Sequence, residues 1–523
     1  MDPFPRSRFL LALAVTLLFA SGARAEALFP VNDPGSGAFV FDQPSVAANG
    51  TFLHVAFIGD NTASGRYKLY YAGINGSADF TNKSTSKDQV VKTRPVAIDN
   101  GASYTDARHP QIAHRSSTST STSLVVLFQA IPAGAAEYKL FRALITLDNN
   151  AVSAQNVSEV SLPGPVRMTG TLVDPSFGLG ATDSFLRTAY ADKITGNVYF
   201  ARIGVDNALV GGAPILLSRQ AGTQGSAPLP RLRLDNLNRS HVAWAANSTT
   251  AAPANICYAM VKEFTPGVDN LAIGATSVLG GGFRWGFPNV LFPASSRILV
   301  LAGDESSGTP GVAGTVGVAY LNPDAVTHDG NPVSVGNVIP GNTFLVFPPG
   351  SAPLSDTFSV YRPEAALDTN TRVHVAGYGS SGPGSQGTAG TYYTMSVNGV
   401  TATTSNLADL LSPREPVGGS SNLAYASTIP GDYTRAAFIH FSTRAVLFWS
   451  GPDNVVAGAR SLYVTSALST TDYIAPTPTT QSGCQAVGEA RRGEPERIPG
   501  AVLLFLPAAL VGLRKLARKA FAR

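Results

Sequence analysis

A strand opened by proline recurs along most of this chain and constrains its fold more than any other feature. The best copy, residues 362–377, reads RPEAALDTNTRVHVAG: an extended segment, a polar turn over Asp368 to Thr371, and the alternating strand VHVA. Related openings occur at Pro44, Pro110, Pro175, Pro230, Pro288 and Pro363. Proline is tolerated at the first residue of a strand, where a ladder does not need its missing N–H.

Two apolar segments follow each opening. The second segments are 52–59, 123–130, 185–192, 240–247, 298–305 and 372–379, and the third segments are 69–74, 140–145, 198–203, 256–261, 316–321 and 391–397. A more variable fourth segment follows, as at 151–162. Successive prolines are 66, 65, 55, 58 and 75 residues apart, and Arg435 opens a seventh copy 72 residues after Pro363. Four-strand repeats of this length are typical of propeller blades.

The two ends of the repeat array support this count. After Arg435 the chain has room for three strands, 436–441, 445–450 and 460–467, and the fourth is missing. The segment from Gly37 to Asp42 precedes the first repeat and can supply the missing outer strand. We therefore predict an all-β fold in residues 26–474: a seven-bladed β-propeller of four-stranded blades, closed by an N-terminal strand added to the last blade.

The repeat pattern of proline, strand, Asp-x-x-Asn turn, HVAW and Tyr-Ala resembles that of sialidase-like (BNR-type) bacterial propellers over residues 37–470. Catalytic sialidases of this kind carry an Arg-Ile-Pro signature and Asp boxes of the form Ser-x-Asp-x-Gly-x-x-Trp. This chain has Tyr361-Arg362-Pro363 in place of the first and no segment that fits the second. The resemblance implies the fold, and the departures argue against sialidase activity.

The N-terminus is typical of a secretory signal peptide. Arg6 and Arg8 precede an apolar run over residues 9–19, and Ala23-Arg24-Ala25 places small residues where a signal peptidase cleaves. We predict a signal peptide over residues 1–25, with Ala25 as the processing residue. A retained anchor or buried helix is the alternative, which a run this short disfavours.

The C-terminus resembles the sorting signals of exported bacterial proteins. A linker over residues 475–497 contains Cys484, and the segment 498–523 combines an apolar run, expected to form a hydrophobic helix, with a basic tail. Basic residues after an apolar run hold that end in the cytoplasm. The resemblance implies that Cys484 is processed or modified and that the protein is tethered to the membrane or cell surface. On the alternative, a peripheral helix or permanent anchor, Cys484 is a free thiol.

The formal net charge of +4 is concentrated at the two ends. Residues 1–25 carry three Arg and one Asp, and residues 485–523 carry eight Lys or Arg and three Glu, which leaves 27 basic and 30 acidic side chains between them. A nearly neutral body has no basic stripe for phosphates, so we expect no nucleic-acid partner. We expect an exported bacterial envelope protein, monomeric, with no cofactor.

Histidines and cysteines give no metal signature. His54, His241 and His374 occupy equivalent strands of different blades, too far apart to share one metal, and we expect structural roles for them. The chain contains no HExxH, Walker or GxSxG motif. Cys257 lies in a strand pattern far from Cys484, so we expect no disulfide. We predict no metal site.

A ligand site in a propeller is built from loops that lead into the innermost strands. The candidates at these positions are Arg108, Arg231, Arg284, Trp285, Tyr361 and Arg362. Arginines in one funnel can bind a carboxylate or sulfate, and aromatic rings can stack on a sugar. We therefore expect a binding or scaffold module for glycans or envelope partners; the alternative is a sialidase-like hydrolase or lyase that holds an anionic sugar.

Overall fold

A computed structural model describes most of the repeat region. The described residues are 29–31, 40–60, 64–80, 87–99, 104–162, 176–178, 186–192, 195–211, 213–219, 224, 229–246, 255–265, 268–279, 284–294, 297–304, 316–322, 344–345, 359–380, 389–395, 399–400, 415–416, 436–442, 444–452 and 459–469. Internal contacts divide the chain into two units, Met1–Thr470 and Thr471–Arg523, and all described residues belong to the first. The signal peptide, the linker with Cys484 and the C-terminal segment lie outside the described residues.

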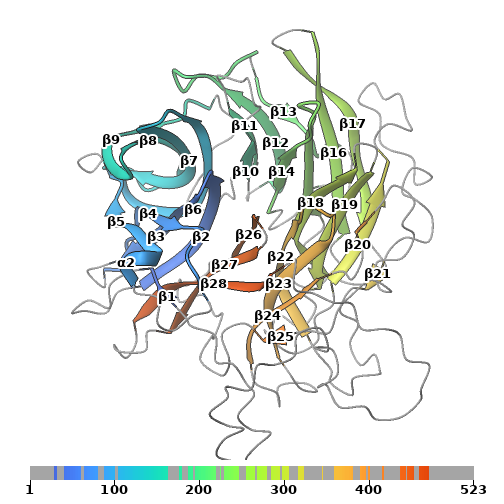
Figure 1. Ribbon diagram of the computed structural model, residues 1–523. Helices are drawn as coiled ribbons and strands as arrows, with labels where there is room; N and C mark the ends of the chain where they lie inside the picture. Colours follow the sequence, from blue (N-terminus) through green and yellow to red (C-terminus); the bar gives the residue numbers. More distant parts are fainter. Residues whose placement is uncertain are drawn as a thin grey trace, which may run out of the picture. The chain divides into compact units, whose positions relative to one another are not determined.

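The described chain is nearly all β-structure (Figure 1). Five sheets have four strands each in chain order: β6 (Tyr104–Ser117), β7 (Ser121–Pro132), β8 (Lys139–Asp148), β9 (Ala151–Glu159); β10 (Ser176–Gly178), β11 (Leu186–Asp192), β12 (Asn197–Ile203), β13 (Ile215–Leu216); β14 (Arg231–Leu234), β15 (Ser240–Ala246), β16 (Asn255–Thr265), β17 (Val268–Leu279); β18 (Trp285–Ala294), β19 (Arg297–Asp304), β20 (Val316–Leu321), β21 (Phe344–Leu345); and β22 (Ser359–Leu367), β23 (Val373–Ser380), β24 (Ala389–Met395), β25 (Glu415–Pro416). The strand segments predicted from the repeats match these bounds closely.

An eight-stranded sheet joins the two ends of the repeat region. It contains β1 (Phe29–Pro30), β2 (Val40–Asn49), β3 (Phe52–Asp60), β4 (Lys68–Asn75), β5 (Val91–Ala97), β26 (Ala437–Phe441), β27 (Arg444–Pro452) and β28 (Arg460–Ser469). The described residues also include one short helix, α2 (Lys87–Val90). No helix within the described ranges combines the length and apolar character that a membrane span requires.

The chain ends meet at β28, as predicted, and the short strand β1 takes part in addition to the predicted segment. β1 pairs antiparallel with β28, with Phe29 opposite Val464, and the Val31 amide donates to the Leu462 carbonyl at 2.7 Å. The predicted segment, Gly37 to Asp42, also adjoins β28: its described part, from Val40, begins β2, which lies next to β28 in the sheet and pairs over most of its length with β3. The parallel contact of β2 with β28 is the pair Val40–Arg460.

The first strands of successive repeats, β2, β6, β10, β14, β18, β22 and β26, lie against one another in chain order, and β26 also contacts β2. The core therefore lies between sheets. On β7, for example, Val126 packs with residues of β3 and β4, whereas Val125 packs with residues of β11 and β12. Alternate side chains of one strand point to opposite faces, so a strand between two neighbours is apolar on both.

A residue with positive φ precedes the proline at five of these first strands, β2, β6, β14, β18 and β22. The residues before proline that have positive φ are Gln43, His109, Leu229, Phe287 and Arg362, with φ between 44° and 53°. The pairing register shifts at this point in β2, β6, β18 and β22. A left-handed residue followed by proline turns the strand sharply and costs backbone energy that the surrounding contacts must offset. These bulges position the side chains of the candidate site.

Candidate functional site at the starts of the first strands

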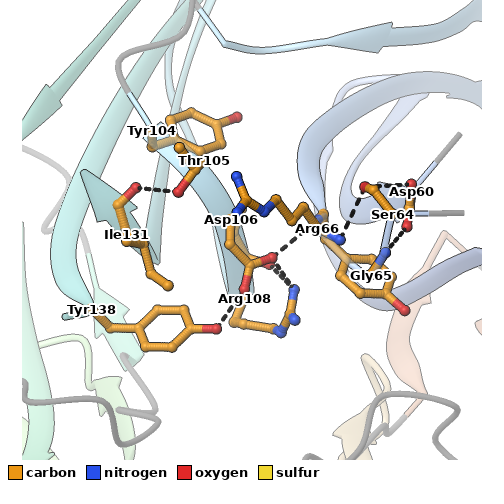
Figure 2. Close-up of polar contacts among 12 residues, drawn as sticks. Asp60, Ser64, Gly65, Arg66, Tyr104, Thr105, Asp106, Arg108, Ile131 and Tyr138 are labelled. Atoms are coloured by element: carbon orange, nitrogen blue, oxygen red, sulfur yellow. Dashed lines mark hydrogen bonds and ion pairs between the residues drawn. The ribbon is translucent and has the colours of Figure 1, made fainter. Parts of the chain in front are cut away.

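A buried polar cluster surrounds Asp106 at the start of β6 (Figure 2). Asp106 Oδ1 accepts a hydrogen bond from Arg108 Nη1 at 2.5 Å and one from the Tyr67 amide at 2.8 Å. The Tyr138 hydroxyl donates to Oδ2 at 2.5 Å. The Arg108 guanidinium also lies over the Tyr67 ring, 4.3 Å from its centre. Arg108 is 6 % exposed, so this cation is held by internal partners.

Two further aspartates face the same cluster from the neighbouring sheet. Asp42 pairs with Ile58 across β2 and β3, and Asp60 lies diagonally from Asp42 on the same sheet face. Ile58 packs against the second sheet, so both carboxylates point toward it. Burial raises the pKa of Tyr67; Arg108 opposes that rise, and the charges of Asp42, Asp60 and Asp106 add to it. Three carboxylates and the Arg108 guanidinium therefore act on Tyr67.

A second buried pair connects sheets that are not neighbours in the chain. Arg231 Nη2 on β14 lies 3.0 Å from Glu364 Oε2 on β22, and the two side chains are 10 % and 3 % exposed. Both residues directly follow the proline of their repeat. Asn289 has the same position on β18, and its Nδ2 donates to the Pro363 carbonyl at 2.8 Å. The position after proline thus connects first strands to each other. The sequence indicated Arg231 but missed Glu364.

The remaining predicted site residues occupy separate environments. The Arg284 amide donates to Asp304 Oδ1 at 3.2 Å. Arg362 places its guanidinium 5.0 Å from the centre of the Phe287 ring. The Tyr361 backbone pairs with Tyr378 across β22 and β23. Arg435, which opens the seventh repeat, lies outside the described residues.

All three tryptophan side chains are buried, so none can stack on a sugar. Trp285 is 1 % exposed and belongs to the hydrophobic cluster between the sheets of β15 and β19. Its ring lies so close to Gly317 that a Cβ there would be 2.6 Å from Trp285 Cη2. Trp244 and Trp449, the other two tryptophans of the chain, are each fully buried. The expected indole face is therefore inside the core.

The histidines on the second strands bond to neighbouring side chains. His54 Nδ1 lies 2.8 Å from the Tyr71 hydroxyl, and His241 Nδ1 lies 2.7 Å from that of Tyr258. Among the described residues, one group of histidine and aspartate side chains has donor atoms close enough to hold a metal: Asp368, His374 and His440. His440 lies on β26, one repeat beyond His374. The sequence missed it because β26 lacks the HVA pattern that marked the other histidines.

Asp235 and Asp368 directly follow the first strands β14 and β22. Burial opposes the ionisation of Asp235, but hydrogen bonds from His241 and Arg239 outweigh it and lower its pKa. At Asp368 burial is likewise outweighed by His374 and Arg372, and the pKa falls. Both carboxyl groups are therefore ionised at neutral pH, as partners of a basic residue four positions later in the turn.

Comparison with known proteins gives only distant similarity, and only to solved structures. No family model matches the chain, and no curated protein matches it. An endo-arabinase from Bacteroides thetaiotaomicron aligns over 57 % of this chain and 94 % of its own, at 11 % identity and a TM-score of 0.33. The catalytic domain of a Coprinopsis cinerea GH62 α-L-arabinofuranosidase aligns over 74 % and 96 %, at 10 % identity and 0.31. A Bombyx mori GH32 β-fructofuranosidase aligns over 89 % and 96 %, at 11 % identity and 0.31. Similarity this low carries no argument about the activity of this chain.

Proposed function

We propose that residues 26–474 form a seven-bladed β-propeller that acts as an exported binding module for glycans. Two observations support the closed arrangement: seven first strands contact one another in succession, with β26 against β2, and β1 pairs with β28. Closure by strands from both chain ends removes the exposed sheet edge that an open array would leave.

The kind of ligand is indicated by one observation: two of the four candidate arginines are already held by internal carboxylates. Arg108 pairs with Asp106, and Arg231 pairs with Glu364. A buried guanidinium would have to break such a pair to hold the carboxylate or sulfate of an anionic sugar, at a cost of several kcal/mol. This disfavours sialidase-like recognition. Around Tyr67 the carboxylates outnumber the guanidinium, which favours ligands with neutral hydroxyl groups.

A glycan array tests this proposal. The purified protein is applied to neutral oligosaccharides and to sialylated, uronic-acid and sulfated ones. We expect retention on neutral glycans that is insensitive to moderate salt, because an uncharged ligand has no ion pair to screen. Selective retention on acidic glycans, lost as salt rises, would contradict the proposal.

A glycan hydrolase is the second candidate, and the gathering of Asp42, Asp60 and Asp106 around Tyr67 favours it. Hydrolysis of a glycosidic bond requires a pair of carboxyl groups, one on each side of the bond. The test measures release of reducing ends from neutral oligosaccharides. Hydrolysis that is lost in both Asp60→Asn and Asp106→Asn, and retained in Asp99→Asn, would establish an enzyme. Asp99 is a suitable control because it forms a partly exposed ion pair with Lys68.

We further propose that the protein reaches the cell envelope through its two ends. Cleavage after Ala25 would leave a mature chain that starts at Glu26, and Cys484 would be the site of processing or modification before the apolar run from Ile498. N-terminal sequencing of the exported protein tests the first step. Fractionation of a Cys484→Ala variant tests the second, with a shift out of the envelope fraction as the expected result.

A further inference from the structure

Two turns of the chain build the same three-residue frame. In the first, Arg239 donates from its amide to Asp235 Oδ1 at 2.8 Å and from Nε to Oδ2 at 2.5 Å, and His241 Nε2 lies 3.1 Å from Oδ2. In the second, the corresponding contacts of Arg372 to Asp368 are 2.8 and 2.6 Å, and His374 Nε2 lies 3.3 Å from Oδ2. The repeat Asp-x-x-x-Arg-x-His therefore orients a carboxylate and an imidazole toward each other twice.

The two frames differ in the residue that the next sheet places against them. At the first frame this residue is Phe292, whose ring centre is 5.0 Å from that of His241. At the second frame it is His440, 5.4 Å from His374 by the same measure. The three-residue frame can therefore form next to an apolar side chain. His440 adds a second imidazole where the duplicate has a phenyl ring.

We propose that Asp368, His374 and His440 bind one divalent transition-metal ion, Zn²⁺ in the first instance. Their donor atoms all lie within 4.8 Å of one another. Zinc–ligand bonds of about 2.0–2.2 Å in a tetrahedral site place donor atoms about 3.3–3.6 Å apart, so donors that lie farther apart must approach one another when the ion binds. His374 is fully buried and Asp368 is 6 % exposed, whereas His440 is half-buried and has room to adjust.

The surroundings select for a transition metal over Ca²⁺ or Mg²⁺. Two imidazoles and one carboxylate suit Zn²⁺ and its neighbours, whereas Ca²⁺ and Mg²⁺ prefer oxygen ligands. Arg372 donates to Asp368 and offsets part of its negative charge, so the imidazoles provide much of the affinity. The Asn370 and Arg372 amides fix the other carboxylate oxygen, each at 2.8 Å, which orients the ligand before the ion arrives.

A third histidine pair provides a matched control. His54 lies close enough to His114 of the next sheet that the charge of His114 lowers its pKa. The residue six positions before His54 is Ala48, where the two frames have Asp235 and Asp368. This pair of imidazoles therefore lacks the carboxylate.

The test is titration of the purified full chain, without a polyhistidine tag, with Zn²⁺ by calorimetry and with Co²⁺ by visible absorption. We expect one equivalent to bind, with the absorption bands of Co²⁺ bound by nitrogen and oxygen. His440→Phe restores the arrangement of the first frame and should fold; it should lose affinity by more than about tenfold, because even outer-shell changes commonly cost that much. His114→Phe should bind as the wild type does.

Thermal melting provides a second readout that does not depend on spectra. Zn²⁺ should raise the Tm of the wild type and of His114→Phe, and leave that of His440→Phe unchanged, because only a bound ion stabilises the native state. Absence of binding by the wild type would overturn the proposal. Equal binding by wild type and His440→Phe would overturn it as well.

Discussion

Arg231 and Glu364 form an ion pair at 3.0 Å although 133 residues separate them in the chain. The pair bridges β14 and β22, across the intervening sheet that begins with β18. Both side chains are at least nine-tenths buried, so each charge requires compensation in the interior, and each contributes to that of the other.

Removal of one partner should therefore cost more than removal of both. We expect Glu364→Gln and Arg231→Met each to lower the free energy of unfolding by about 3–5 kcal/mol, because a buried charge loses an ion-pair partner. The double variant Arg231→Met, Glu364→Leu should recover much of that loss. Urea denaturation of the four proteins measures this coupling. Additive losses would show that the pair contributes no mutual stabilisation.

Substitution in the strand that joins the chain ends should destabilise both ends together. Val31 is fully buried and packs with residues of the first and last repeats, such as Phe41 and Val464. Val31→Asp places an uncompensated charge in that cluster, and we expect a loss of about 3 kcal/mol or more. Hydrogen exchange should show that the amides of β28 lose protection. Val205→Asp, at a residue 60 % exposed, is the control and should change neither quantity.

We expect the folded protein to lose stability in weak acid because of His54. Burial, with a smaller contribution from His114, lowers the pKa of His54 to about 4 from its ordinary 6.5. Between these values the unfolded chain binds a proton that the native state does not, so stability falls as pH falls from 6.5 to 4. The shift corresponds to about 3 kcal/mol. The Tyr71 hydroxyl, 2.8 Å from Nδ1, is the other polar group at this ring.

The measurement is urea unfolding at several pH values between 4 and 7. His54→Gln should show a shallower pH dependence than the wild type. Phe52→Leu alters a ring stacked on His54 and leaves the titrating group in place, so it should lower stability by a similar amount at every pH. An unchanged slope in His54→Gln would show that His54 does not cause the acid sensitivity.

The strands could be predicted from the sequence because their signals are local. Proline at the strand start, alternation after it and a polar turn all act within a dozen residues, and β22 and β23 begin and end close to where RPEAALDTNTRVHVAG indicates. The strand β1 could not be predicted because it consists of two residues, Phe29–Pro30, too few for a periodic pattern. The predicted segment, Gly37 to Asp42, meets β28 through the pair Val40–Arg460 at the start of β2.

The site could not be predicted because its contacts cross between sheets. Glu364 follows a proline that the repeat located correctly, yet nothing near it in the sequence indicates that Arg231 is its partner. His440 likewise meets His374 because consecutive sheets face each other. Such pairs depend on how strands of different sheets are placed relative to one another, and local patterns in a single sequence do not indicate that placement.

Trp285 and Gly317 pack so closely that the core has no space for a side chain at position 317. A Cβ at position 317 would lie 2.6 Å from Trp285 Cη2 and 2.9 Å from Cζ3, both shorter than real contacts allow. The indole is 1 % exposed and surrounded by the side chains of the cluster that includes Val300 and Ala319, so it cannot move aside freely. Gly317→Ala should therefore cost about 1–3 kcal/mol by overpacking. In a Trp285→Leu background the same substitution should cost less, because the smaller side chain leaves room for the methyl group. Urea denaturation of the two single variants and the double variant measures the coupling, and an equal cost of Gly317→Ala in both backgrounds would contradict the contact.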